Sequence, residues 1–183
     1  LNWTRHINTV ISSCNYKLFY LRQALKHSTL AVRLVAFNAI VQPTLDYASI
    51  IWYLYTKKNI SEMEKIQKRA VRFIYNSFGR TSITRLLSKA NLSTPTQRNK
   101  VLRLKFFFQL VKGYYKLDLS HILNFSTGYA TRQRHSLTIT PFSTRNNTFK
   151  YSFFPRTIIE WNNLSNEVVS QSSLNLFAAQ LQQ

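Results

Sequence analysis

The stretch ISEMEKIQKRAVRFI, from Ile60 to Ile74, has the clearest helical pattern in the 183-residue sequence. Its apolar residues recur at intervals of three and four, which places them on one side of a helix at about 100° per residue. They are Ile60, Met63, Ile66, Ala70, Phe73 and Ile74. The basic residues on the opposite side are Lys65, Lys68, Arg69 and Arg72. The stretch therefore predicts an amphipathic helix with one face for a core and one basic face.

Two short segments predict where helices begin. SEME, at residues 61–64, has the form of a capping box, in which a hydroxyl and a carboxylate satisfy backbone amides at a helix start. TPTQ, at residues 94–97, has the same form and places Pro95 at the favoured first helical position. We therefore expect one helix to begin at Ser61. A second should run from Thr94 to about Lys112, where Gly113 ends it.

The remaining pattern before residue 119 is also helical. Only three glycines and four prolines occur in the chain, which indicates long helices with few breaks. Residues 1–25 predict a first helix, and Ser28 is expected to cap a second helix that bends at Pro43. SITRLLSKA, at residues 82–90, predicts a short helix.

After Leu119 the helical period disappears and Ser, Thr, Asn and Arg become frequent. LTIT (137–140) and TFKYS (148–152) alternate like two strands, with a turn between them at residues 146–147. PRTIIEWNNL (155–164) predicts a short helix, and Ser172 or Ser173 is expected to cap a last one. The sequence thus predicts a mostly α-helical bundle of about five to seven helices, with a small β-hairpin near the C-terminus.

The charge balance favours a polyanionic partner. Lys and Arg number 25 against six Asp and Glu, giving a net charge of +19, while 45% hydrophobic residues argue against a disordered basic tail. Further bases follow the basic helix within about thirty positions, and many modest phosphate contacts are rewarded by counterion release. We therefore predict nucleic-acid contacts at Lys65, Lys68, Arg69, Arg72, Arg80, Arg85, Arg98, Lys100 and Arg103. Tyr75 and Phe78 are candidates for stacking on bases, although each by itself is more typical of a core or rim residue.

The residues needed for common catalytic sites are sparse. Metal-dependent polymerases and nucleases need clustered carboxylates, yet the only aspartates, Asp46 and Asp118, lie far apart in sequence. Asp46 is expected to pair with an arginine or to cap a turn. The four histidines show no metal-ligand spacing, and the sequence has no nucleophile motif and no phosphate-binding glycine loop. We therefore expect no independent enzyme activity, no metal and no cofactor.

Two further features bear on location. Cys14 is the only cysteine, so an internal disulfide is excluded, and a reduced nuclear or cytoplasmic setting fits. The most apolar region, residues 34–55, contains Asp46, and an aspartate at a membrane centre costs about 2.5–3.5 kcal/mol. A buried helix is therefore favoured over a membrane span, and no integral membrane association is expected. The chain begins at Leu1 without a methionine, which suggests a fragment or a processed product.

Four segments resemble, in the same order, the C-terminal region of non-LTR (LINE-type) retrotransposon reverse transcriptases, especially those of jockey-like arthropod elements. They are LNWTRHI (1–7), VQPTLDYASIIW (41–52), EMEKIQKRAVRFI (62–74) and SFFPRTIIEWNNL (152–164). The resemblance spans nearly the whole chain. It implies a thumb-like basic helical bundle over residues 1–118 and a C-terminal appendage over residues 119–183. In this family the thumb helices grip the template–primer duplex.

The resemblance also implies a parent polyprotein with an upstream palm domain, which would carry the polymerase activity that this chain lacks. The expected partners are that palm domain and RNA or an RNA–DNA hybrid. The alternative is a peripheral polyanion- or membrane-surface-binding interaction protein without a polymerase origin. One departure is Ser165, where the family usually has proline.

The last of the four segments is expected to be a packing motif that closes the bundle. Its residues are Phe154, Pro155, Arg156, Ile158, Trp161, Asn162 and Leu164. The apolar members are spaced to seal one face of a short helix. Arg156 is expected to contact a phosphate or, with more weight, a carboxylate such as Glu160 or Asp46.

Overall fold

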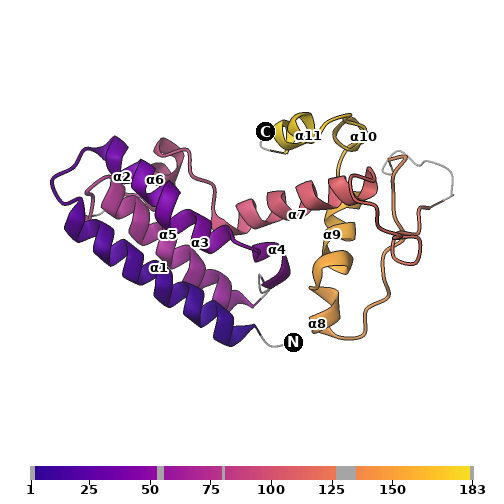
Figure 1. The fold of residues 1–183 in the computed structure, drawn as a ribbon, viewed down its shortest axis with the longest axis horizontal. Coiled ribbons are helices and arrows are strands. Elements are labelled where there is room, and N and C mark those ends of the chain that lie inside the picture. The colour runs from indigo at the N-terminus through magenta and orange to yellow at the C-terminus, as the bar shows by residue number, and fades with distance from the viewer. Residues whose placement is uncertain (1–2, 53–55, 80, 127–134, 182–183) are drawn as a thin grey trace. The chain divides into compact units, whose positions relative to one another are not determined.

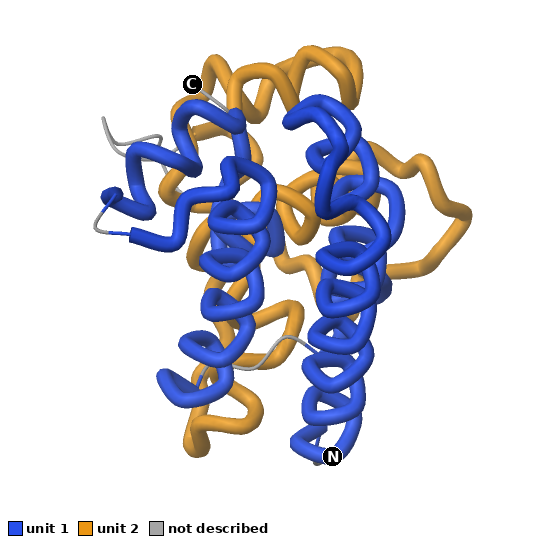
Figure 2. Tube along the Cα trace, turned by 90° about the vertical axis from the view of Figure 1, so that its left-hand side faces the viewer, with its two compact units in different colours: residues 1–99 blue, residues 100–183 orange. Residues whose placement is uncertain are grey.

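The structure is a computed structural model that describes residues 3–52, 56–79, 81–126 and 135–181 (Figure 1). The chain divides into two compact units, residues 1–99 (unit 1) and residues 100–183 (unit 2) (Figure 2). Within the described residues there are eleven α-helical segments, one π-helical segment and no β-strand. The prediction of five to seven helices with a β-hairpin is therefore wrong, although helices do dominate the described residues.

Unit 1 is built around two long helices. α1 (Thr4–Ala24) packs against α5 (Lys57–Ile74), and α6 (Ile83–Lys89) also packs on α5. Between α1 and α5 in sequence lie α2 (Leu30–Ala36), the π-helical segment η1 (Phe37–Val41), α3 (Gln42–Asp46) and α4 (Ser49–Trp52). The core combines the apolar faces of these helices, and its fully buried members include Ile7, Phe37, Val41, Leu45 and Ile66. The apolar stripe predicted for α5 does face this core.

The second helical region is irregular around Pro43. The helix passes through the π-helical turn of η1 immediately before α3, in which Pro43 occupies one of the first positions. Proline lacks an amide hydrogen and its ring clashes with the carbonyl four residues earlier, so a regular α-helix cannot continue through it. Ala48, with a φ of 50°, ends the region. A π-helical turn therefore lies next to Pro43, where the sequence predicted a bend.

Thr29, rather than Ser28, caps α2. The Thr29 hydroxyl accepts from the amide of Val32 at 3.5 Å, whereas the Ser28 hydroxyl donates to the carbonyl of Leu25 at 2.8 Å. Ser28 thus completes the end of α1. The prediction was wrong by one residue because adjacent hydroxyl residues can each serve a helix end.

Of the two predicted capping boxes, only the second forms. α5 already begins at Lys57, after Thr56, so Ser61 lies inside the helix and the first prediction is wrong. Nothing between Lys57 and Ile60 breaks a helix, so the helix extends past the motif. In α7 (Pro95–Val111), the backbone amide of Gln97 donates to the Thr94 hydroxyl at 3.2 Å, and the side-chain oxygen Oε1 of Gln97 accepts from the Thr94 backbone amide at 3.0 Å. Gly113, with a φ of 71°, follows the helix as predicted.

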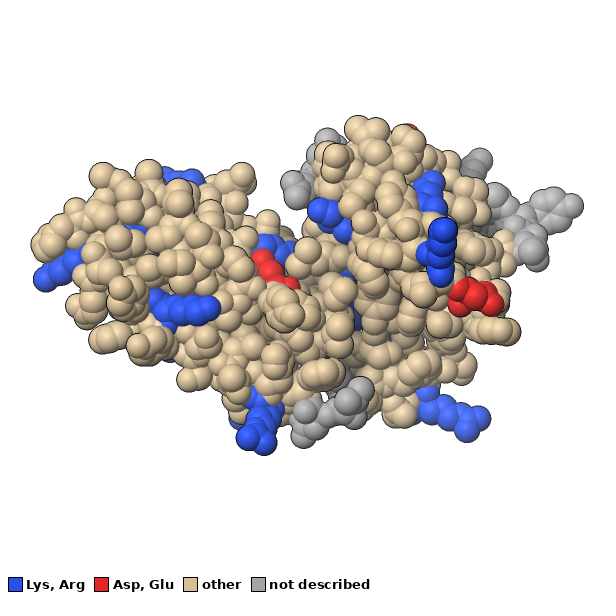
Figure 3. All heavy atoms as spheres, in the orientation of Figure 1, with Lys and Arg blue, Asp and Glu red and all other residues tan. Residues whose placement is uncertain are grey.

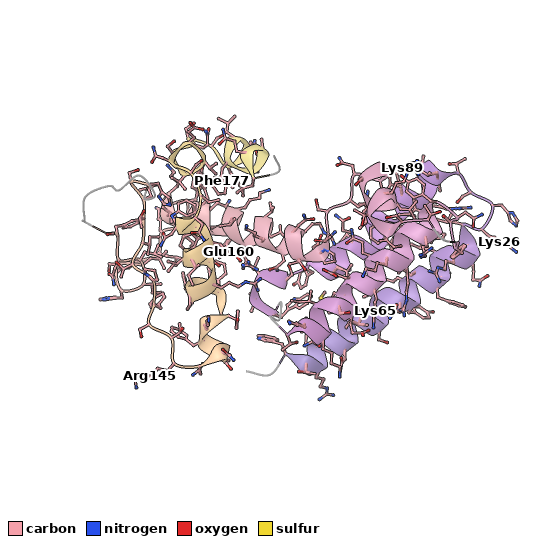
Figure 4. The ribbon with its side chains drawn as sticks, turned by 180° about the vertical axis from the view of Figure 1, so that it is seen from behind. Lys26, Lys65, Lys89, Arg145, Glu160 and Phe177 are labelled. Atoms are coloured by element: carbon pink, nitrogen blue, oxygen red, sulfur yellow. The ribbon has the colours of Figure 1, made fainter. Side chains whose placement is uncertain are left out.

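Unit 2 has a core rich in aromatic rings. It contains α8 (Asn147–Lys150), α9 (Phe153–Asn162), α10 (Asn166–Val169) and α11 (Leu174–Gln180). Phe108 of α7 stacks on Phe177 of α11 with 4.4 Å between ring centroids (Phe177 is labelled in Figure 4). Phe107 meets Trp161 edge to face at 5.3 Å. The second half of α7 thus contributes to this core, so the compact units divide at residues 99 and 100, whereas the sequence placed a boundary at 118.

The two predicted strands of unit 2 do not form. Ile139 makes only an isolated antiparallel bridge with Phe125, and residues 147–150 form the helix α8 instead of a second strand. The cause is local, because the side-chain oxygen of Asn146 accepts from the amide of Phe149 at 2.8 Å and caps α8. A residue expected to form a hairpin turn therefore begins a helix. Ser173 similarly caps α11, as one of the two predicted alternatives.

The segment at residues 135–139 is held by side chains of α9. The Trp161 indole N–H donates to the carbonyl of Leu137 at 2.9 Å. The Asn162 amide pairs with both backbone groups of Ile139, accepting from its N–H at 3.0 Å and donating to its C=O at 2.7 Å. A ring nitrogen of His135 lies 3.1 Å from the Trp161 carbonyl oxygen. These bonds replace those that a partner strand would supply.

The closing motif is largely buried in unit 2. Ile158 and Trp161 have no exposed surface, Pro155 is buried, and Phe154 and Leu164 are half-buried against the same core. Arg156 donates to Glu160 at 3.4 Å, one of the two carboxylates considered from the sequence. The motif thus packs α9 into the unit and fixes residues 135–139. No helix in the described parts of the chain is long and apolar enough to cross a membrane.

Candidate nucleic-acid interface

A row of basic side chains follows α5 on the side opposite its buried stripe. Its members, called here the basic face, are Lys58, Lys65, Lys68, Arg69 and Arg72. All but the half-buried Arg72 are exposed. The sequence-based prediction did not include Lys58, because the helix was expected to begin only at Ser61. Its spacing of seven residues from Lys65 is the signal that could have found it.

One carboxylate lies within the basic face. Glu62 accepts from the Lys65 ammonium group at 2.6 Å. This hydrogen bond and the charges of Lys65, Arg69 and Lys58 lower the pKa of Glu62 below its ordinary value. A solvent-exposed pair of this kind contributes little to stability, so Lys65 can exchange this partner for another anion at small cost.

Arg69 connects the basic face to α1. Its guanidinium donates to the side-chain oxygen of Asn15 at 2.7 Å, and Arg22 of α1 donates to the Arg69 carbonyl at 3.2 Å. Arg22 therefore belongs to the same basic region, although no local pattern in the sequence groups it with α5. Burial and the neighbouring charge of Arg69 lower the pKa of Arg22 from its ordinary value.

Arg72 has a structural task in addition to its charge. It donates to the carbonyls of Ser77 at 3.2 Å and Gly79 at 2.9 Å, and so orders the turn after α5. Lys68, in contrast, is exposed and makes no hydrogen bond or ion pair with any residue that the structure describes. Lys68 is therefore the member of the face that can be changed with least effect on folding.

α6 presents two more exposed cations, Arg85 and Lys89, four residues apart on one side of the helix. Neither has a bonding partner within the described ranges. Figure 4 shows Lys65 and Lys89 on different helices of unit 1. Lys100, in unit 2, is likewise exposed. Arg80 lies outside the described residues.

Two of the predicted contact residues are held in internal ion pairs. The Nε of Arg98 lies 3.1 and 3.0 Å from the two oxygens of Asp46, within unit 1. Arg103, only 2% exposed, donates to both oxygens of Glu160 at 2.8 and 2.6 Å, within unit 2. Glu160 is labelled in Figure 4. Both arginines therefore serve their own units, and the sequence could not reveal this because their partners lie more than fifty residues away.

Asp46 pairs with an arginine, as predicted. Burial raises the pKa of Asp46 from its ordinary value, and the charge and hydrogen bond of Arg98 oppose that rise. Arg98 also donates to Gln67 at 2.9 Å and to the Ser93 carbonyl at 2.6 Å, so the pair belongs to a larger network. Among the residues described, no group of three or more His, Cys, Asp or Glu is arranged to hold a metal ion.

The surface charge is predominantly positive. On the side of each unit that Figure 3 shows, Lys and Arg outnumber Asp and Glu, and the cations lie apart from one another. Such spacing suits several separate phosphate contacts better than a single tight anion pocket. Comparisons of the chain with family models, with curated proteins and with solved structures found no match.

Proposed function

We propose that unit 1 binds the sugar–phosphate backbone of RNA or of an RNA–DNA template–primer duplex through the basic face. The proposal includes an origin as the non-catalytic, thumb-containing part of a LINE-type reverse transcriptase that works in the nucleus and cytoplasm. In the parent polyprotein a palm domain would perform the polymerase chemistry. The support for this origin is the order of the four sequence segments.

The observation that carries the binding proposal is the imbalance of charge in unit 1. Residues 1–99 contain 15 of the 25 Lys and Arg residues but only three of the six acids. Each of these acids already has a partner: Asp46 bonds to Arg98, Glu62 to Lys65, and Glu64 accepts from the Thr96 hydroxyl at 3.4 Å. The remaining exposed cations therefore have no acidic partner within the described part of unit 1 and are available to an external polyanion. Counterion release favours the binding of such a polyanion.

The second candidate function is binding to an anionic membrane surface. It is favoured by one observation, the exposed aromatic residues Tyr16, Phe19 and Tyr20 on α1, which are 73%, 60% and 63% exposed. Aromatic and basic side chains together also suit the interfacial region of a bilayer. The nucleic-acid proposal ranks first because these aromatic residues lie on α1, whereas the exposed residues of α5 are all polar or charged.

A competition experiment separates the two functions. The chain is bound to a labelled RNA–DNA duplex at several salt concentrations, and vesicles of phosphatidylcholine with phosphatidylserine are added as competitor. We expect log affinity to fall linearly with log salt, with a slope of about 0.9 for each phosphate contact on a B-form duplex and a similar value on a hybrid. Vesicles should not release the duplex. Displacement by vesicles, or binding without salt dependence, would contradict the proposal.

A further inference from the structure

Arg22 of α1 and Arg69 of α5 carry guanidinium charges that repel each other where the two helices pack. Arg22 uses one terminal nitrogen to bond the Arg69 carbonyl, and Arg69 uses one to bond Asn15. The other terminal nitrogen of each guanidinium has no partner in the described part of the structure. Their mutual repulsion would be relieved by an anion, because the remaining terminal nitrogen of each arginine can donate to a phosphate oxygen.

Two exposed phenylalanines lie beside this pair. The Arg22 guanidinium carbon is 6.0 Å from the centroid of the Phe78 ring, which is 62% exposed. Phe19 lies one helical turn before Arg22 on α1 and is 60% exposed. A cationic pair flanked by open aromatic faces combines the two kinds of group that bind single-stranded nucleic acid.

From this arrangement we infer that Arg22 and Arg69 bind a phosphate of an unpaired nucleic-acid strand, and that Phe78 stacks on an adjacent base. The inference rests on the proposed function and specifies its substrate as unpaired nucleotides, such as a template overhang beside a duplex. Phe19, on α1, provides a second stacking surface.

An unpaired strand fits these residues better than a duplex does. The bases of a duplex are stacked on one another, so an exposed ring such as Phe78 has no base face to contact. Stacking does not depend on sequence, since every base has an aromatic face, so the site should take any unpaired sequence. Phe78 also lies in the turn that Arg72 orders through Ser77 and Gly79, which holds the ring beside the basic face.

The stacking part is tested with Phe78→Leu in the full chain. Phe125→Leu is the matched control, because Phe125 is also exposed (45%) but lies in unit 2. The probes are an oligouridylate, an abasic oligomer of the same length and an RNA–DNA duplex. Phe78→Leu should weaken oligouridylate binding about 5- to 150-fold, the range for loss of one base–aromatic stack. Binding of the abasic oligomer and of the duplex should stay within about twofold of wild type.

The phosphate part is tested with Arg22→Gln, and Arg145→Gln in unit 2 is its control. Arg22→Gln should weaken binding of both single-stranded probes and lower the salt slope by about 0.7, the value for one contact on a single strand. If Phe78→Leu lowered the affinity for the oligouridylate and for the abasic oligomer equally, stacking by Phe78 would be overturned. An unchanged slope for a folded Arg22→Gln variant would overturn the phosphate contact. If one of these two results is found while wild type still binds the duplex with salt dependence, only the further inference is contradicted and the proposed function stands. If wild type does not bind the duplex at all, both are contradicted.

Discussion

Unit 1 and unit 2 are held together in different ways. The core of unit 1 consists mainly of aliphatic side chains from long helices, whose apolar residues recur at helical spacing. The core of unit 2 contains a larger share of aromatic rings, and its non-helical segment at residues 135–139 is fixed by side chains of α9. Unit 1 also has the larger share of unpaired surface cations. We therefore place the proposed ligand-binding surface on unit 1, while the motif at residues 152–164 serves packing in unit 2.

The largest expected effect on stability comes from Trp161→Ala in unit 2. Trp161 has no exposed surface, contacts Phe107 and Phe177, and donates to the Leu137 carbonyl. Removal of such a ring should lower the free energy of unfolding by about 3–5 kcal/mol. Chemical denaturation followed by circular dichroism measures the loss. Unchanged unfolding would mean that Trp161 does not hold the aromatic core together.

A slightly smaller effect is expected for Glu160→Ala, which leaves the buried charge of Arg103 without its partner. Breaking such a pair costs about 3–5 kcal/mol, and the 21% exposure of the Glu160 side chain favours the lower end. The double variant Arg103→Met with Glu160→Leu should be closer to wild type than Glu160→Ala is, because the buried charge of Arg103 is removed. Arg156, which also loses Glu160 in both variants, is less buried than Arg103. A double variant less stable than Glu160→Ala would show that the pair itself stabilises unit 2.

The pH dependence of unit 1 should report the buried Cys14. Burial raises the pKa of this thiol to about 11, whereas an exposed thiol has a pKa near 9.0. Above that ordinary value the unfolded chain loses the proton first, so stability is fully present below pH 9 and falls as pH rises towards 11. The slope is at most about 1.4 kcal/mol per pH unit. Cys14→Ala removes this component, so its stability should fall less steeply than that of wild type over the same range.

The two capping-box sequences give a matched pair with a smaller effect. Thr94→Ala should lower stability by about 1 kcal/mol, since it removes the acceptor for the Gln97 amide. Ser61→Ala should be neutral or stabilise by up to about 0.5 kcal/mol, because Ser61 is an exposed residue inside α5 and alanine is the better helix former. Equal losses in the two variants would contradict the assigned start of α5.

The sequence predicted those features that depend on local periodicity. The apolar stripe of α5, the capping box at Thr94 and the stop at Gly113 all follow from residues within a few positions of one another. The start of α5 was missed because nothing in residues 57–60 marks a boundary. The strand at residues 148–152 was wrong because the alternation of short polar and apolar residues does not exclude a helix, and the Asn146 cap decided between them.

The candidate site was predictable only in part. The stripe of bases from Lys65 to Arg72 is visible in the sequence, since its members share one helix. Arg98 and Arg103 were assigned to the interface because they follow the basic helix within about thirty positions, and their acidic partners are too distant in sequence to be recognised. Arg22 was omitted because its proximity to Arg69 depends on the packing of α1 against α5. Charge alone therefore predicts a class of partner, and tertiary contacts decide which cations remain available to it.

The central claim, that the cations of unit 1 bind the nucleic-acid backbone, is tested most directly by two charge-matched variants. In one, Lys58, Lys65 and Lys68 of unit 1 are changed to Gln. In the other, the exposed Lys112, Lys116 and Lys150 of unit 2 are changed to Gln, so both variants lose the same charge. Circular dichroism confirms that each is folded.

The measurement is the slope of log affinity against log salt for an RNA–DNA duplex, compared among the two variants and wild type. We expect the unit 1 variant to lower the steepness by about 2–3, the value for three lost phosphate contacts at 0.7–0.9 each. The unit 2 variant should keep the wild-type slope. An equal reduction in both variants would show that net charge alone attracts the duplex, and an unchanged slope in the unit 1 variant would show that its basic face is only solvated surface.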